Sequence, residues 1–134
     1  MPRGLATADL RRPPEELAGE LGRSFAEFGF AVVRNHGIPA GLVARAEALQ
    51  KALFALPVEA KRAYAVPGGG GARGYTPFGR EIAKGAGVHD LKEFWHIGRS
   101  LPEWHPLSGA MAPNVWPDEL PGFRATMEEL YAAF

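Results

Sequence analysis

The sequence predicts a mixed α/β fold of the α+β kind, in which several helices are combined with a few short strands. Three segments repeat apolar residues at intervals of three and four, which is the pattern of amphipathic helices. Between them lie short runs rich in β-branched and aromatic residues, which favour strands. The chain has 134 residues and is 46% hydrophobic, so it is long enough to form one domain with its own core.

The first predicted helix covers residues 14–28. Pro14 suits a first helical turn, and Glu15 and Glu16 suit the positive end of the helix dipole. Gly29 is a natural stop. Residues 1–13 are expected to form an N-terminal arm. One face of the helix is apolar and consists of Leu17, Leu21, Phe25 and Phe28.

A strand and two further helices are predicted next. Residues 30–34 contain two valines in an apolar run, which indicates a buried strand followed by a polar turn. Pro39 opens an amphipathic helix at residues 40–56, and a short helix at residues 58–64 follows Pro57. The longer helix carries a stripe that predicts core packing. Its members are Leu42, Ala46, Leu49, Leu53 and Leu56.

The second half of the chain is less regular. Gly68–Gly71 is expected to form a flexible loop, because it lacks the lysine and Ser/Thr that complete a phosphate loop. Residues 73–79 predict a short extended piece and a turn, and the aromatic-rich Asp90–Ile97 predicts a strand. Five prolines within residues 100–121 leave room for few regular elements. A last helix is predicted at residues 122–134, with Phe123, Met127, Leu130 and Phe134 on one face.

The composition excludes several classes of function. Basic and acidic residues number 15 each, so there is no positive surplus for binding nucleic acid or a membrane surface. The absence of cysteine excludes disulfides, thiolate metal sites and cysteine nucleophiles. No segment has the apolar length of a signal peptide or the roughly 20 apolar residues of a membrane span, and we expect a cytoplasmic protein.

Five blocks of sequence, in this order, resemble the N-terminal region of the isopenicillin N synthase-like dioxygenases, which use non-haem iron and mostly 2-oxoglutarate. The family's usual first strand, an Ile-Pro-x-Ile-Asp-like segment, is not recognisable before Asp9. The last two blocks favour the bacterial members, a group that includes ethylene- and succinate-forming homologues. The blocks are GF-x-VV-x-NHGIP (residues 29–39), F-x-LP-x-E-x-K-x-x-Y (54–64), RGYTPFGRE (73–81), DLKEFWHIGR (90–99) and N-x-WP-x-x-LPGFR (114–124).

The resemblance implies that residues 14–134 are the N-terminal domain of such an oxygenase, cut within its long connecting helix. The missing part would be a double-stranded β-helix, or jelly-roll, barrel. In the intact family enzyme, that barrel binds Fe(II) through His-x-Asp and a distant histidine, and it anchors 2-oxoglutarate through Arg-x-Ser. A barrel supplied by fusion or by a separate gene would be the partner of this chain, and a small molecule would be the substrate.

The iron ligands and the 2-oxoglutarate anchor are not found in this sequence. The run Arg99-Ser100-Leu101 is not Arg-x-Ser, and no histidine has an acid two residues later. We therefore expect no catalytic residue, no metal ligand and no Fe(II) or 2-oxoglutarate bound to this chain alone. Each histidine has a structural interpretation. We expect His36 to serve the geometry and hydrogen bonding of its turn, and His96 to be partly buried and hydrogen-bonded to backbone. His89 and His105 are expected on loop surfaces.

Four residues are candidates for binding the prime substrate, because their segments resemble the family's barrel mouth. Arg73 could pair with a carboxylate through its planar fork, and Tyr75 could add a hydroxyl to an apolar wall. Glu93 and Trp95 share a strand face and could flank a substrate. The alternative is that both aromatic residues belong to the core and that both charged residues are solvated or salt-bridged.

Two functions from different classes fit the sequence. The first is the scaffold and substrate-side domain of a non-haem Fe(II)/2-oxoglutarate-dependent oxygenase, an oxidoreductase, with the chain inactive on its own. The second is a stand-alone, non-catalytic module that binds a partner or a ligand. Such a module would need its exposed apolar faces, at residues 30–33 and on the last helix, to be covered.

Overall fold

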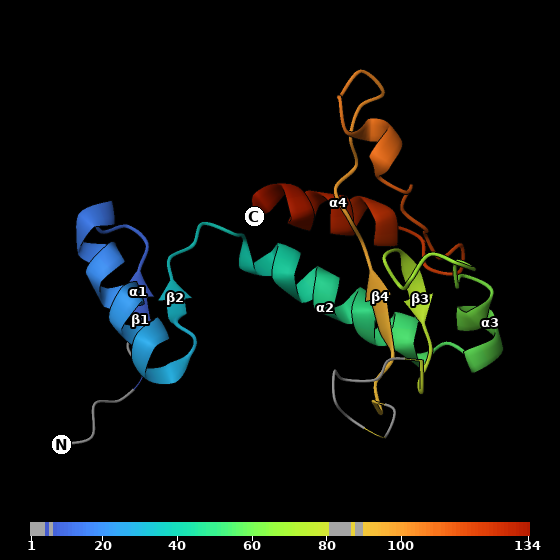
Figure 1. Ribbon diagram of the computed structural model, residues 1–134, viewed down its shortest axis with the longest axis horizontal. Coiled ribbons are helices and arrows are strands. Elements are labelled where there is room, and N and C mark those ends of the chain that lie inside the picture. The colour runs from blue at the N-terminus through green and yellow to red at the C-terminus, as the bar shows by residue number, and fades with distance from the viewer. Residues whose placement is uncertain (1–4, 6, 81–86, 88–89) are drawn as a thin grey trace. The chain divides into compact units, whose positions relative to one another are not determined.

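The structure is a computed structural model that describes residues 5, 7–80, 87 and 90–134. It confirms a mixed α/β fold, and its contacts divide the chain into a first unit of residues 1–40 with 133–134 and a second unit of residues 41–132 (Figure 1). In chain order, the elements are β1 (Thr7–Asp9), α1 (Pro14–Phe28), β2 (Val32–Arg34), α2 (Ala40–Ala55), α3 (Val58–Arg62), β3 (Gly74–Thr76), β4 (Phe94–His96), the 3₁₀ turn η1 (Ser108–Ala110) and α4 (Phe123–Ala133).

The first unit is a two-stranded parallel sheet with one helix. Strand β1 pairs with β2 in the register Thr7 to Val32, and α1 provides the crossover that parallel strands require. Helix α1 has its predicted bounds. Gly29 adopts a left-handed conformation (φ 77°) and donates its N–H to Phe25 O at 3.0 Å. The buried Ser24 hydroxyl donates to Phe30 O at 2.8 Å and fixes the chain as it leaves the helix.

One element of this unit was not predicted, and one prediction for it is wrong. The family's usual first strand was not recognisable before Asp9, yet β1 lies at Thr7–Asp9. Its three residues carry no strand pattern of their own, and the Asp9 carboxylate fixes its end by accepting bonds from Arg11 at 2.9 and 3.1 Å. These bonds, above all, hold the pKa of Asp9 well below its usual range. Strand β2 is exposed rather than buried, because β1 is its only partner among the described residues.

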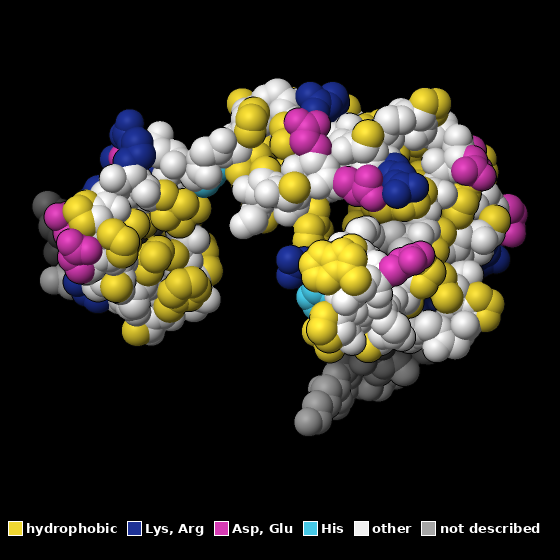
Figure 2. Space-filling model, turned by 90° about the horizontal axis from the view of Figure 1, so that it is seen from above, with side chains coloured by type: hydrophobic (Ala, Val, Ile, Leu, Met, Phe, Trp, Pro, Cys, Tyr) yellow, Lys and Arg dark blue, Asp and Glu magenta, His cyan; other side chains and the backbone are white. Residues whose placement is uncertain are grey.

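An apolar surface therefore remains on the first unit. In Figure 2, hydrophobic side chains gather over this part of the molecule. Phe25 is 57% exposed and Phe30 is 55% exposed. Four more of the large apolar side chains exposed on this unit are named here, with these two, as the first-unit apolar face. They are Leu10, Phe28, Val32 and Val33.

The second unit contains the core. Helices α2 and α4 run side by side in Figure 1, and their buried residues form one cluster. The buried members are Ala46, Leu53, Phe123 and Met127. Around them pack Leu49, Leu56, Trp95, Ile97, Trp116, Leu120 and Leu130, so both predicted stripes are confirmed apart from Phe134, which is 92% exposed.

The strands of the second unit form an antiparallel pair, β3 with β4, in which Tyr75 lies opposite Trp95. The predicted strand at residues 90–97 is shorter than expected, because β3 offers only three pairing residues, and Leu91 is 91% exposed. Residues 68–71 form a turn with positive φ at three glycines. The proline-rich segment, residues 100–121, contains only η1, as expected. No described helix is long and apolar enough to cross a membrane.

The core predicts a large difference between two identical substitutions. Leu53 is 1% exposed and Leu91 is 91% exposed. Leu53→Ala should lower the free energy of unfolding by about 2–5 kcal/mol, because it leaves a cavity between α2 and α4. Leu91→Ala should change it by less than about 0.5 kcal/mol. Urea unfolding followed by circular dichroism measures both, and equal losses would contradict the position assigned to this core.

Candidate functional site

The four predicted substrate residues lie on or beside the β3–β4 pair. Residues opposite each other in a pair project from the same face, as do alternate residues of a strand. Tyr75, Trp95 and Glu93 therefore share one face of this small sheet, and Arg73 precedes β3. The structure thus brings three of the four together, at the side where α3 packs against β3.

A lysine that was not predicted as a site residue organises this face. Lys61 of α3 has a side chain only 4% exposed, and its Nζ lies 2.9 Å from Glu93 Oε2 and 3.0 Å from Oε1. Its Nζ also donates to Phe54 O at 2.8 Å. The Tyr75 hydroxyl donates to Glu93 Oε2 at 2.5 Å. We call Lys61, Tyr75 and Glu93 the buried ion-pair cluster.

The charges of this cluster follow from its surroundings. Burial, followed by the hydrogen bond to Glu93, raises the pKa of Tyr75 to about 12. Burial acts against ionisation of Glu93, but hydrogen bonds from Tyr75 and Lys61 outweigh it and leave the pKa of Glu93 below its ordinary value. At neutral pH, Glu93 is therefore an anion whose oxygens already have partners, and Tyr75 is a neutral donor.

Trp95 faces the core. Its ring lies 5.5 Å from that of Tyr64 and 6.1 Å from that of Phe123, measured between centroids. Its indole Nε1 is buried and has no hydrogen-bond partner among the described residues. These contacts are those of a core aromatic residue.

Arg73 is held by backbone carbonyls. Its Nε donates to Ala112 O at 3.1 Å and its Nη1 to Ala72 O at 2.6 Å. The guanidinium lies over Gly98, where an added Cβ would come within 2.1 Å of Nη2. A side chain at position 98 would displace this guanidinium from its two carbonyls.

Two of the cavities formed by described residues lie in the second unit. The β3 cavity, of about 480 Å³, brings Arg73 and Tyr75 together, whereas Glu93 and Trp95 do not line it. Its other lining residues are Ala65, Val66, Gly68, Gly70, Gly71, Thr76, Pro77, Arg80 and Phe94.

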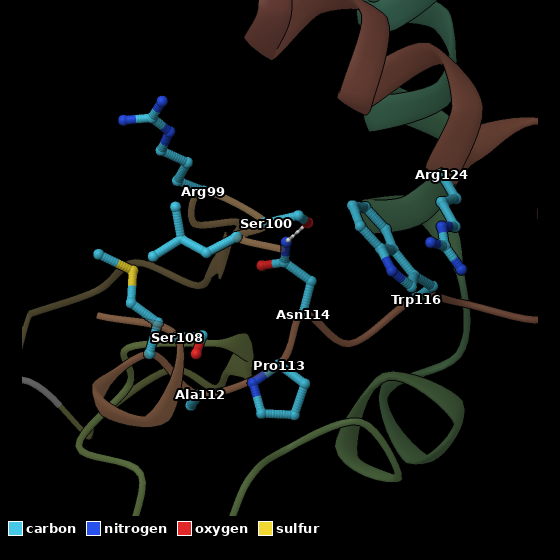
Figure 3. A pocket seen from close by; sticks show the side chains of 10 residues that line it. Arg99, Ser100, Ser108, Ala112, Pro113, Asn114, Trp116 and Arg124 are labelled. Atoms are coloured by element: carbon cyan, nitrogen blue, oxygen red, sulfur yellow. Dashed lines mark hydrogen bonds between the residues drawn. The ribbon is translucent and has the colours of Figure 1, made fainter. Parts of the chain in front are cut away.

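The other cavity, of about 380 Å³, is drawn in Figure 3. The amide of Asn114 closes it on one side, accepting from Gly98 N–H and donating to Gly98 O, both at 2.8 Å. Arg124 lies over the Trp116 ring at 5.8 Å. The Asn114 amide therefore joins its own segment to the backbone of Gly98.

The three histidines that the structure describes do not form a metal centre. His36 accepts from Ile38 N–H at 3.1 Å in an exposed turn, and His105 accepts from Leu107 N–H at 3.1 Å in a loop, both as predicted. His96 bonds to the Gly71 carbonyl as predicted, but it is exposed rather than partly buried, because it lies on the outer face of β4. His89 lies outside the described residues.

The residues present do not fit Fe(II). Among the described residues, no three His, Cys, Asp or Glu side chains lie close enough together to hold a metal ion. The histidines at 36, 89, 96 and 105 are followed two positions later by Ile38, Leu91, Gly98 and Leu107, so none belongs to a His-x-Asp pair.

Comparison with known proteins identifies one family. A family model described as "non-haem dioxygenase in morphine synthesis N-terminal" matches residues 5–119. The proline hydroxylase buaE of Petromyces alliaceus is 38% identical over 124 residues, which are 87% of this chain and 37% of that protein. The 2-oxoglutarate-dependent dioxygenase caaD of Aspergillus niger is 31% identical over 121 residues, 89% of this chain and 37% of that protein.

Solved structures agree with this assignment. A 2OG-Fe(II) oxygenase family protein from Caulobacter crescentus is 44% identical, with a TM-score of 0.80 over 97% of this chain and 43% of that one. Neurospora crassa T7H, solved in complex with alpha-KG, is 25% identical, with a TM-score of 0.72 over 96% of this chain and 42% of that one. The chain thus spans well under half the length of these relatives.

The buried ion-pair cluster predicts a pH-dependent stability. Lys61→Met leaves the Glu93 carboxylate buried without its cation, and it should lower the free energy of unfolding by about 3–5 kcal/mol at neutral pH. The folded-state pKa of Glu93 is depressed, so its stabilising contribution is complete above its ordinary value of 4.5 and is lost as the pH falls through the folded-state value. The gap between parent and variant should therefore narrow in acid.

Urea titrations at several pH values test this. The control is Arg62→Met, which breaks an exposed pair with Glu59 and should cost at most about 1 kcal/mol. The double variant Lys61→Met/Glu93→Leu should recover much of the loss, because no charge is then left unpaired. A loss of stability that does not vary with pH would show that the ion pair is not its cause.

Proposed function

We propose that this chain supplies the scaffold and part of the substrate wall of an Fe(II)/2-oxoglutarate-dependent oxygenase. The chain belongs to the non-haem dioxygenase family, and it matches the N-terminal domain of that family. The β3 cavity is the observation that carries this proposal. It brings the side chains of Arg73 and Tyr75 together with those of Thr76 and Arg80, among glycines and apolar residues. A small-molecule site commonly combines these features.

The buried ion-pair cluster gives this cavity a rigid base. Tyr75 lines the cavity with part of its side chain, while its hydroxyl is bonded to Glu93. Lys61 connects the same carboxylate to α3. Glu93 thus supports the wall from behind, and we propose that its effect on a substrate is exerted through Tyr75.

The catalytic centre would lie in a part of the oxygenase that this chain does not contain. When bound there, Fe(II) and 2-oxoglutarate would supply the oxidising chemistry. The first-unit apolar face supports a partner of this kind, because a group of exposed apolar side chains often marks a contact surface (Figure 2). We propose that the jelly-roll barrel, fused or separately encoded, is that partner, and that the intact enzyme is of the bacterial isopenicillin N synthase-like type.

Self-association of a stand-alone module is the competing explanation for the apolar face. Sedimentation velocity distinguishes the two. A concentration-dependent dimer that is unaffected by a co-expressed barrel would favour the module. Formation of a one-to-one complex with the barrel would favour the oxygenase.

We predict that the chain alone does not convert 2-oxoglutarate to succinate, because it contains no His-x-Asp pair to form the facial triad. Succinate release is measured with Fe(II), ascorbate and oxygen, against a metal-only blank. If succinate is released above the blank, and if His36→Ala and His96→Ala each abolish that release, the site is shared between copies of the chain. Release that survives these changes would refute the ligand argument itself.

We predict that Arg73→Ala and Tyr75→Phe, in the complete enzyme, impair use of the primary substrate more than they impair 2-oxoglutarate affinity. Loss of a charge-assisted bond to a substrate carboxylate should lower kcat/KM about 10–150-fold. The measurement is steady-state kinetics with each co-substrate varied in turn. Arg62→Ala, an exposed arginine paired with Glu59, is the matched control. Equal losses for both co-substrates, together with a lowered melting temperature, would mark Arg73 and Tyr75 as structural.

A further inference from the structure

The β3 cavity contains a hydroxyl that no contact explains. Thr76 ends β3 and is 9% exposed, and its Oγ1 has no hydrogen-bond partner among the described residues. Buried polar groups nearly always have partners, and a buried group without one calls for an explanation. Thr76 also lines the cavity, so a bound molecule could supply the missing partner.

The glycine loop leaves space beside this hydroxyl. Gly71 has a positive φ of 77°, and a Cβ built on it would lie 3.0 Å from Thr76 Oγ1 and 3.7 Å from Phe94 Cε2. The missing side chain thus leaves a small concave space between a hydroxyl and an aromatic ring edge. Any larger residue at position 71 would fill that space and strain the turn.

A cation is available at the same cavity. Arg80 lines it and makes no ion pair or hydrogen bond with another described residue. The guanidinium of Arg73, by contrast, is already bonded to Ala72 O and Ala112 O. Arg80 can therefore pair with a ligand charge without giving up a bond to another described residue.

We propose that Thr76 and Arg80 form a carboxylate subsite in the β3 cavity. The Thr76 hydroxyl donates to one carboxylate oxygen, and the planar guanidinium of Arg80 pairs with the carboxylate. Phe94, Val66 and Pro77 contact the apolar part of the same molecule. The ligand class is a small carboxylic acid with an apolar body.

A phosphate ligand fits this cavity less well. The glycine run lacks the lysine and Ser/Thr of a phosphate loop, and the element that follows it is the strand β3. The identification of the carboxylic acid as the primary substrate rests on the proposed function. The binding itself requires neither iron nor turnover.

The test uses this chain with benzoate as the probe and benzamide as its neutral counterpart of the same shape. Amide shifts in ¹⁵N-labelled protein give both affinities. Benzoate should bind at least about tenfold more tightly than benzamide, and Thr76→Val should weaken benzoate binding about tenfold or more, since it removes a bond to a charged group. Arg80→Gln should also weaken it. Thr76→Ser should bind within about twofold of the parent, because it keeps the hydroxyl.

Two measurements separate binding from folding. Thr76→Val should leave the melting temperature of the free protein unchanged or raised, because it removes an unpaired buried hydroxyl. Thr126→Val, the same change at a buried threonine of α4 that does not line this cavity, should leave benzoate binding unchanged. The proposal is overturned by equal affinity for benzoate and benzamide, by unaltered binding in Thr76→Val or Arg80→Gln, or by a lowered melting temperature in Thr76→Val. If this chain joined to an oxygenase barrel showed no activity, that result would count against the proposed function alone. The benzoate-binding results would not be affected.

Discussion

The buried ammonium of Lys61 is the constraint on which the second unit depends. An unpaired charge in this position would be strongly unfavourable, so the chain must bring Glu93 and the Phe54 carbonyl to it. Meeting this requirement fixes α3 against the end of α2 and against β4. With three residues in each strand, the β3–β4 pair has few backbone bonds of its own, and the ion pair makes up for them. The cavity beside β3 takes its shape from this arrangement.

The helices could be predicted from the sequence because their information is local. The spacing of Leu42, Ala46 and Leu53 is visible in any short window, as are Pro14 and Gly29 at the ends of α1. Short strands depend on partners that are distant in sequence. The residues Thr7–Asp9 carry no pattern that predicts β1. The valines of β2 were predicted to be buried, which requires a covering layer that the described residues do not provide. Both β1 and β2 depend on tertiary partners, so strand propensity alone could not predict the position of the first or the exposure of the second.

The candidate site was predictable in outline only. Arg73, Tyr75, Glu93 and Trp95 do gather around one small sheet, but their partners could not be inferred from the sequence. The sequence pattern of a short helix does not show whether a lysine on it is solvated or buried. The burial of Lys61 therefore could not be predicted, and only its place in the block at residues 54–64 was visible. An unpaired hydroxyl such as that of Thr76 is a property of three-dimensional packing, and the sequence carries no trace of it.

The pairing of Asn114 with Gly98 makes the side-chain amide behave as an additional peptide unit, with one bond given and one received. The intervening residues, from Arg99 to Pro113, therefore form a loop whose two ends are already joined. Loop-closure entropy grows only slowly with length. This segment can consequently gain, lose or exchange residues at little cost to the core, and it is the natural place for variation among related chains and for insertion of a foreign peptide.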